Sequence, residues 1–243
     1  TLGYKTLSAN TTGFYNVAVG SRALANMNVT DSSGTINTAV GYNAGNDVTT
    51  GTNNTFIGAY AGDALTDADF NTAVGVNALT ADTLGSRSTA VGWGALQAQN
   101  FTTATNAYNV AVGNLAGTAI TTGTLNTLIG GEAGDALTSG NSNVAIGYQA
   151  LTADTLGDRN IAIGNGALAA QNFTTTTDAY NIAIGQEAGL SVTTGVRNTL
   201  IGGTTGQGLT TGGENVAVGY GALYTDDLGS HNVAVGVSAL QNQ

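Results

Sequence analysis

The spacing of one short motif constrains the fold of this chain more than any other feature of its sequence. The motif N-x-A-[V/I]-G-x-x-A occurs thirteen times, and the starting positions of successive copies differ by 21, 17, 17 and 17 in a repeating series. Four copies therefore form a superrepeat with a period of 72. Fixed periods of this kind are typical of solenoids, in which each repeat packs mainly on its neighbours. The copies begin at Asn16, Asn37, Asn54, Asn71, Ser88, Asn109, Asn126, Asn143, Asn160, Asn181, Asn198, Asn215 and Asn232.

Each copy of the motif predicts a short β-strand between two tight turns. The residue after the Asn is β-branched in every copy, and the residue two places further on is always Val or Ile. Such side chains favour the pleated surface of a sheet. A Gly closes the strand, and a second turn residue, usually Gly, lies three places before the Asn, where we expect a positive φ. Two tight turns in every copy predict a small coil.

The alternation of side chains along each strand divides them between two faces. The first and third strand residues share one face, and the second lies on the other. The second residue is Ala in ten copies and Phe56, Leu128 or Leu200 in the remaining three. We expect the branched residues to fill the coil interior and the alanine row to pack against other copies of the chain. The stacked Asn side chains should bond from amide to amide along a ladder that Ser88 interrupts.

The four coils of a superrepeat differ in a regular way. In two of them a Leu follows the Ala after the strand, as at Leu24, whereas in the other two a Gly takes this position, as at Gly45. The 21-residue coil adds four residues beside Val29, Phe101 or Phe173, which predicts a bulge or a longer loop. We predict an all-β fold over residues 1–243, a single parallel β-solenoid of 17- and 21-residue coils. Residues 1–3 and Gln243 fall within partial copies, so we expect both ends to cut a repeat.

Composition excludes several classes of function. The chain has no Cys, so disulfides, zinc–thiolate sites and thiol nucleophiles are ruled out. A net charge of -10 with five Lys and Arg residues argues against binding to nucleic acid or to anionic membrane surfaces. No apolar run approaches the roughly 20 residues that a membrane helix needs. We expect no cofactor, no nucleic acid partner and no membrane insertion by this segment.

The motif N-[V/T]-A-[V/I]-G-x-x-A resembles the head repeats of the YadA-like trimeric autotransporter adhesins and is similar to repeat arrays of phage tail fibres. The resemblance covers almost the whole chain. It implies a left-handed parallel β-roll, three chains side by side around a common axis, and a role in surface attachment. The coils are longer than those of the adhesin heads, and the four-coil superrepeat is a second difference.

Recurring carboxylates are the first candidates for chemistry. They lie at Asp82, Asp154 and Asp226, and at Asp63 and Asp135. Equivalent members are one superrepeat apart, which corresponds to four coils or about 19 Å at the usual strand spacing, too far for the paired carboxylates of a glycosidase. We therefore expect solvated turn residues and no catalytic residue. Calcium is an alternative at Asp67 with Asp69, or at Asp226 with Asp227, although no known calcium repeat is present, and we predict no metal site. His231 should be an exposed polar residue.

Aromatic residues are the second candidates. The residue directly after the strand-closing Gly varies freely, as a surface position should, and we predict ligand binding by the four aromatic residues there: Tyr42, Trp93, Tyr148 and Tyr220. Exposed rings stack on sugar faces and anchor interfaces. The alternative is that these rings cover loops or contacts between chains. Tyr108 and Tyr180, directly before a motif Asn, should be packing residues.

We predict that the protein is not an enzyme but a homotrimeric, extracellular structural rod of an attachment fibre, either a bacterial adhesin head or a phage tail fibre on a virion. It would mediate or support binding to a host or surface receptor, glycan or protein. The alternative is a glycan-binding module that uses the exposed aromatics. Two further alternatives have less support: a polysaccharide depolymerase, and an ice-binding solenoid suggested by the pairs Thr49–Thr50, Thr121–Thr122 and Thr193–Thr194.

Overall fold

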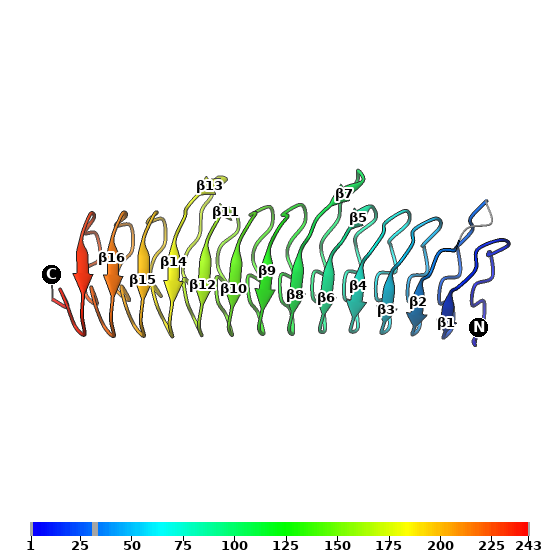
Figure 1. Cartoon of the computed structure of the whole chain (residues 1–243), viewed down its shortest axis with the longest axis horizontal. Coiled ribbons are helices and arrows are strands. Elements are labelled where there is room, and N and C mark those ends of the chain that lie inside the picture. Colours follow the sequence, from blue (N-terminus) through cyan, green and yellow to red (C-terminus); the bar gives the residue numbers. More distant parts are fainter. Residues whose placement is uncertain (1, 31–33, 243) are drawn as a thin grey trace. The chain divides into compact units, whose positions relative to one another are not determined.

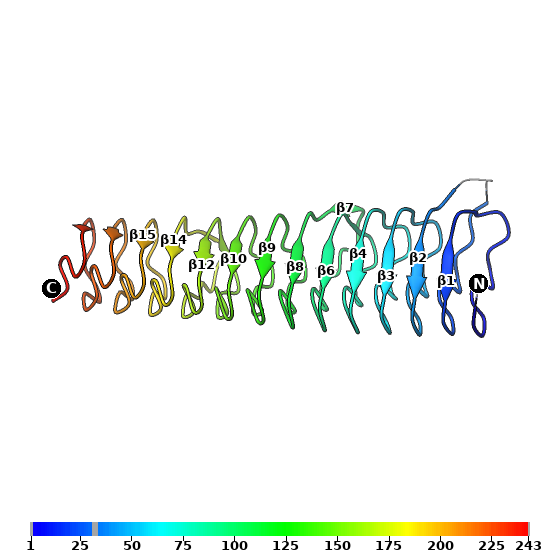
Figure 2. The same ribbon diagram turned by 60° about the horizontal axis from the view of Figure 1, so that its bottom comes forward.

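The computed structural model describes residues 2–30 and 34–242 and divides the chain into two compact units, Thr1–Thr124 and Leu125–Gln243. Each unit is a parallel β-solenoid, as the motif spacing predicts (Figure 1). Within a unit the strands lie side by side in both views, and each coil returns behind its own strand (Figure 2).

The described residues of the first unit form six three-residue strands, each beginning directly after a motif Asn or after Ser88. Neighbouring strands pair in parallel, with equivalent motif positions opposite one another. These strands are β1 (Val17–Val19), β2 (Thr38–Val40), β3 (Thr55–Ile57), β4 (Thr72–Val74), β6 (Thr89–Val91) and β8 (Val110–Val112). Leu2 pairs with Val19, in register with the partial copy that the sequence predicts, whereas Thr1 and Gln243 lie outside the described residues.

The described residues of the second unit form seven three-residue strands with the same parallel register. They are β9 (Thr127–Ile129), β10 (Val144–Ile146), β12 (Ile161–Ile163), β14 (Ile182–Ile184), β15 (Thr199–Ile201), β16 (Val216–Val218) and β17 (Val233–Val235).

Two of the 21-residue coils carry an extra two-residue strand, which pairs with a similar strand on the coil before. In the first unit β5 (Gly85–Ser86) pairs with β7 (Thr105–Asn106), and in the second β11 (Gly157–Asp158) pairs with β13 (Thr177–Asp178). The segments that lead into β7 and β13 project beyond the other coils of their units (Figure 1). Residues 102–104 and 174–176 are exposed. The insertion is therefore a longer loop, one of the two predicted alternatives. The equivalent segment beside Val29 includes residues 31–33, which lie outside the described residues.

The two faces of each strand are the reverse of the prediction. The middle residue of every three-residue strand is buried, whereas the first and third are exposed or partly exposed. In β14, Ala183 is 0% exposed and Ile184 is 36% exposed. The alanine row therefore lines the coil interior, and the branched row faces outward. A small residue suits the interior because leucines from later in the coil, such as Leu24 and Leu79, already occupy it.

Size complementarity between coils accounts for the arrangement of Gly and Leu within the superrepeat. Phe56 is fully buried beside two glycines that stand where other coils have Leu. A Cβ atom on Gly62 would lie 2.4 Å from Cε1 of Phe56, and one on Gly45 would lie 2.6 Å from its Cδ2. In the second unit Leu200 lies between Gly189 and Gly206 in the same way. One large strand residue thus fills the space of two absent leucines.

The glycines three places before each motif Asn do not have the positive φ that we expected. Space is limited at these positions instead. A Cβ on Gly51 would lie 2.5 Å from the carbonyl oxygen of Ala68 in the next coil, whereas at Gly85, Gly157 and Gly229 it would meet the Asp three residues earlier. The left-handed conformation instead occurs at the residue directly before the motif Asn, for example at Arg87 (φ 66°) and Tyr108 (φ 51°). Close packing, not backbone conformation, explains this row of glycines.

The Asn ladder exists, but its bonds run mainly to the backbone. Oδ1 of Asn54 accepts a hydrogen bond of 2.8 Å from the backbone N–H of Asn71, and its Nδ2 donates one of 2.7 Å to the carbonyl of Ala68. Nδ2-to-Oδ1 bonds between successive side chains occur as well, as from Asn215 to Asn198 at 3.0 Å. Each buried amide therefore satisfies two backbone groups of the next coil, which fixes the spacing between coils.

Candidate interaction surface

The outward-facing first and third strand residues form the surface that we call the outer face. Its third residue is Val or Ile on every coil, and its first residue is Val, Ile or Thr. Its most exposed members in the first unit are Val17, Val19, Val40, Ile57 and Val112. In the second unit they are Ile129, Ile184, Ile201, Val216, Val233 and Val235. Parallel pairing in register repeats these side chains on every coil. Monomeric soluble proteins rarely expose contiguous apolar surface of this kind, so the outer face is suited to burial against another molecule.

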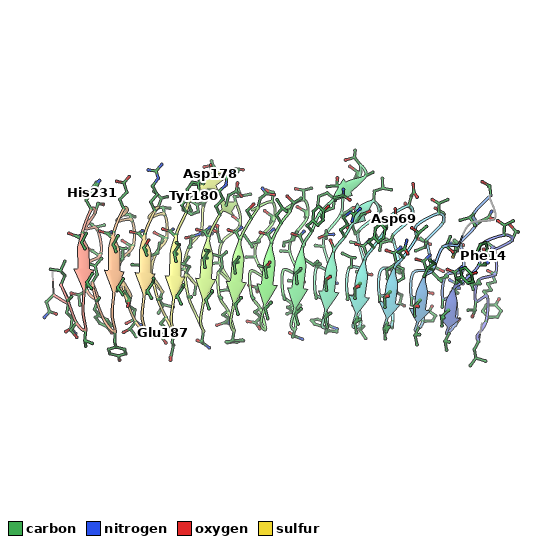
Figure 3. All side chains as sticks on the ribbon, viewed as in Figure 1. Phe14, Asp69, Asp178, Tyr180, Glu187 and His231 are labelled. Carbon is green, nitrogen blue, oxygen red and sulfur yellow. The ribbon has the colours of Figure 1, made fainter. Side chains whose placement is uncertain are left out.

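Two rows of side chains border the outer face. The upstream edge consists of the residue directly before each motif Asn or Ser88, and the downstream edge consists of the first two residues after each strand-closing Gly. Figure 3 shows Tyr180 and His231 along the upstream edge of the second unit and Glu187 on its downstream edge. The upstream edge comprises Tyr15, Ile36, Asn53, Phe70, Arg87 and Tyr108 in the first unit, and Leu125, Ser142, Arg159, Tyr180, Arg197, Glu214 and His231 in the second.

The prediction that Tyr108 and Tyr180 are packing residues is wrong. Tyr108 is 49% exposed and Tyr180 is 47% exposed, because both belong to the upstream edge. Residues two apart along a strand share a face, so the exposure of the first strand residue also predicts exposure of the residue before the Asn. This could not be seen while the first strand residue was assigned to the interior.

Aromatic and basic side chains stack along the upstream edge of the first unit. Cζ of Arg87 lies 4.8 Å from the ring centroid of Phe70 and 5.8 Å from that of Tyr108, on the coils before and after it. The Nε atom of Arg87 also donates a hydrogen bond of 3.0 Å to Oδ1 of Asn106. Cation–π contacts of this kind hold the guanidinium in place at the surface.

Ion pairs and a cation–π contact lie along the upstream edge of the second unit. Arg159 pairs with Asp178 and lies over the ring of Tyr180, with Cζ 5.5 Å from the ring centroid. Arg197 contacts Glu214 at 3.1 Å. Nε2 of His231 lies 2.9 Å from the same Glu214 carboxylate, and the His231 side chain is exposed, as predicted.

The four predicted ligand-binding aromatics all lie exposed on the downstream edge, but none of them adjoins another. Three strand steps separate the coil of Tyr42 from that of Trp93, and four separate Tyr148 from Tyr220. Tyr42 instead makes an edge-to-face contact with Tyr60, with ring centroids 5.3 Å apart. The rings of Tyr148 and Tyr220 lie against glycines of the preceding coils, Gly131 and Gly203. Each ring is a separate element of the surface.

Three of the five recurring carboxylates are buried, contrary to the prediction of solvated turn residues, whereas Asp63 and Asp135 are partly exposed. Asp82 and Asp154 are both 0% exposed, and Asp226 is nearly as inaccessible. Oδ2 of Asp154 accepts a hydrogen bond of 2.6 Å from Gln171, and its Oδ1 accepts bonds from the backbone N–H groups of Gly157 and Phe173. Burial raises the pKa of the Asp154 carboxyl, and these donors oppose the shift.

Gln171 continues this network to the Asn ladder. Its Oε1 accepts a hydrogen bond of 2.8 Å from Nδ2 of Asn181. In the first unit Asp82, Gln99 and Asn109 repeat the arrangement. These aspartates therefore cross-link the strand rows to the long coil, which is a structural role.

No group of three or more His, Asp or Glu residues within residues 2–30 and 34–242 could hold a metal ion, including the aspartates considered for calcium. The same ranges contain no helix long and apolar enough to cross a bilayer. An open cleft of about 230 Å³ in the first unit has no carboxylate or His in its lining, which is Lys5, Ser8, Arg22, Ala25, Asn26 and Asn46.

Comparisons with protein-family models, with curated proteins and with solved structures gave no match. The resemblance to adhesin heads and tail-fibre arrays therefore stays a prediction from the motif. What the repeats and the coordinates establish is the architecture: the chain is a parallel β-solenoid repeat protein.

Proposed function

We propose that this segment is a structural spacer of a homotrimeric attachment fibre, in which copies of the chain pack through their outer faces. The observation that carries the proposal is the exposure of Val and Ile on successive coils of both units. Burying this surface between copies would remove it from water, which is favourable by roughly 25 cal/mol per Å² of apolar area. The alanine row, which we had expected at this contact, is already buried inside each coil.

The number of copies, the left-handed winding and the location rest on the motif resemblance. A trimer with its axis parallel to the stack of coils would present three equivalent outer faces to a common centre. Such a fibre would lie outside the cell or on a virion and would carry or space a receptor-binding segment. Three copies would also multiply weak contacts with a host receptor, whether glycan or protein.

Velocity sedimentation tests the assembly directly. We expect the purified chain to sediment as a trimer at micromolar concentration and to dissociate on dilution. A monomer at every concentration would contradict the proposal. A dimer or tetramer would retain the role of the outer face but remove the threefold arrangement.

Glycan binding by the downstream edge is a second candidate function. The indole of Trp93 is 49% exposed on this edge, and an exposed ring can stack on a sugar face. We expect Trp93→Ala to lose binding to glycan arrays with an unchanged circular dichroism spectrum. Val76→Ala, in the same row one coil earlier, is the matched control. Equal binding by both variants would remove this candidate.

Neither of the two remaining alternatives gains support from a specific contact. For ice binding, the hydroxyls of a threonine row should face water, but Oγ1 of Thr49 donates to the carbonyl of Thr66, and Oγ1 of Thr66 donates to that of Thr83. For hydrolysis of polysaccharide, Asp82 and Asp154 are buried within hydrogen-bond networks instead of lining a cleft. We therefore propose a non-enzymatic role.

A further inference from the structure

The two edges of the second unit carry complementary groups at matching levels of the stack. Strands β12, β14 and β15 are successive neighbours, and their upstream residues are Arg159, Tyr180 and Arg197. The two guanidiniums therefore lie one coil before and one coil after Tyr180, at about 4.8 Å per coil. On the opposite, downstream edge, the coil of β14 carries Glu187 (Figure 3). Along the stack, the Glu187 carboxylate on the downstream edge is thus at the level midway between the guanidiniums of Arg159 and Arg197 on the upstream edge.

The side chains at both edges are positioned by contacts within the chain. Oε2 of Glu187 accepts a hydrogen bond of 2.8 Å from Nε2 of Gln207. Arg159 and Arg197 are exposed, and each contacts one carboxylate, Asp178 or Glu214. Because a guanidinium has five N–H donors, one carboxylate leaves donors for a second.

Symmetry decides which edges meet when outer faces pack together. If copies are related by rotation about an axis parallel to the stack, the upstream edge of one copy meets the downstream edge of the next at the same level. If they are antiparallel, like edges meet, and around β14 Glu187 faces Glu187 while Arg159 faces Arg197. Like charges in contact are unfavourable, so the charge pattern favours the parallel arrangement.

We propose that copies of this chain associate in parallel and in register, with the Glu187 carboxylate of one copy between the guanidiniums of Arg159 and Arg197 of the next. The inference rests on the proposed packing of outer faces and adds its direction, its register and the residues that select them. The apolar rows recur on every coil and would tolerate a shift by one or more coils. Charges at a single level of the stack would exclude such shifts.

Glu132 provides a matched control for Glu187. It occupies the same position of its coil, and its Oε2 accepts a hydrogen bond of 2.8 Å from Gln149. The upstream residue of its own coil is Leu125, and that of the next coil is Ser142. A copy packed in register would therefore offer Glu132 no cation from these two coils.

Charge reversal tests the pairing by sedimentation equilibrium. We expect Glu187→Arg to weaken self-association at least tenfold and Glu132→Arg to change it less than twofold. The double variant Arg159→Glu/Arg197→Glu should be as weak as Glu187→Arg, and combining all three substitutions in one chain should restore association. If the wild-type chain is a monomer, the proposed assembly fails. If it is an oligomer that responds equally to both glutamate substitutions, only the edge pairing fails.

Cysteine cross-linking gives an independent readout of direction in this Cys-free chain. Tyr180 and Gln186 lie at the same level on opposite edges. With a short bismaleimide, a mixture of Tyr180→Cys and Gln186→Cys chains should form covalent heterodimers, whereas Tyr180→Cys alone should not cross-link. Cross-linking of Tyr180→Cys with itself, or a mixture without heterodimers, would overturn the parallel register.

Discussion

Phe56 shows how one large side chain determines which residues can lie next to it. Its ring occupies the space that two leucines fill elsewhere, and the residues beside it are Gly62 on its own coil and Gly45 on the coil before. The coil of Ala73 has the opposite combination, with a small strand residue and Leu79. Gly62 (φ 57°) and Leu79 (φ 54°) have the same backbone conformation, so it is the volume of the Phe56 ring, not the backbone, that requires Gly at position 62.

Phe56→Ala should lower the free energy of unfolding by about 3–5 kcal/mol, because it leaves a cavity between two glycines. Adding Gly62→Leu to this variant should recover part of the loss, since it recreates the Ala–Leu combination of the next coil. Urea denaturation followed by circular dichroism measures both effects. A double variant no more stable than Phe56→Ala would contradict the account of complementary volumes.

The buried Asp154 carboxyl predicts a dependence of stability on pH. Its pKa in the folded chain is raised by burial above the unfolded value of about 3.9. The folded state therefore holds this proton more tightly, and the stabilisation is fully present below the unfolded pKa and declines as pH rises through the folded pKa. The stability of the wild-type chain relative to Asp154→Asn should fall from pH 3.5 to pH 7 in urea titrations. A stability difference between the two chains that stays constant or rises with pH would show that folding does not raise the pKa of the Asp154 carboxyl.

At the scale of the coil, the Asn ladder joins each turn of the solenoid to the next. The row and its break at Ser88 could be predicted from the sequence, because the spacing of Asn is visible there. The partners could not be predicted, since they are backbone groups that come close only when the Gly rows stack. The same close approach explains why those glycines are needed despite an ordinary φ.

Replacing one ladder residue should leave two backbone groups unsatisfied. In Asn54→Ala the N–H of Asn71 and the carbonyl of Ala68 lose their partner. Each buried unsatisfied group costs about 1–3 kcal/mol, so we expect a large fall in the urea midpoint. The exposed Asn114, replaced by Ala, should change stability by less than about 0.5 kcal/mol. Similar midpoints for the two variants would show that the ladder contributes little.

Strand positions, coil lengths and parallel stacking could all be predicted from the repeat, whereas the direction of the faces could not. Alternation fixes which residues share a face but not which face is inside. Deciding that requires the volume of the interior, which depends on side chains from later in the coil and from neighbouring coils. The burial of Asp82 was missed for the same reason, since its partners Gln99 and the N–H of Phe101 are 17 and 19 residues away.

At the scale of the whole molecule, the candidate surface was only partly visible in the sequence. The exposed aromatics after the closing Gly were predicted correctly as surface residues. Their separation along the stack was implied by the spacing, but their contacts with Tyr60, Gly131 and Gly203 required coordinates. The outer face was not predicted, because its branched strand residues were expected to fill the coil interior.

Two neighbouring residues of β14 test the corrected assignment of the faces. Ala183→Glu places a carboxylate in the closed interior and should unfold the surrounding coils, with loss of the circular dichroism signal. Ile184→Glu places the same group on the outer face and should leave the fold intact while preventing self-association. The two measurements are circular dichroism and sedimentation velocity. A folded Ala183→Glu variant or an oligomeric Ile184→Glu variant would contradict this assignment.

The alternation of Phe or Leu strands with paired glycines also restricts how such an array can change in length. Loss or gain of a single coil would separate a bulky strand residue from one of its glycines, or separate a buried aspartate such as Asp82 from its partner Gln99 on the next coil. Loss or gain of a whole superrepeat restores every neighbour to its proper partner. Unequal recombination within a gene of this kind should therefore survive selection only in whole groups of four coils, which makes fibre length a quantity that evolves in discrete steps.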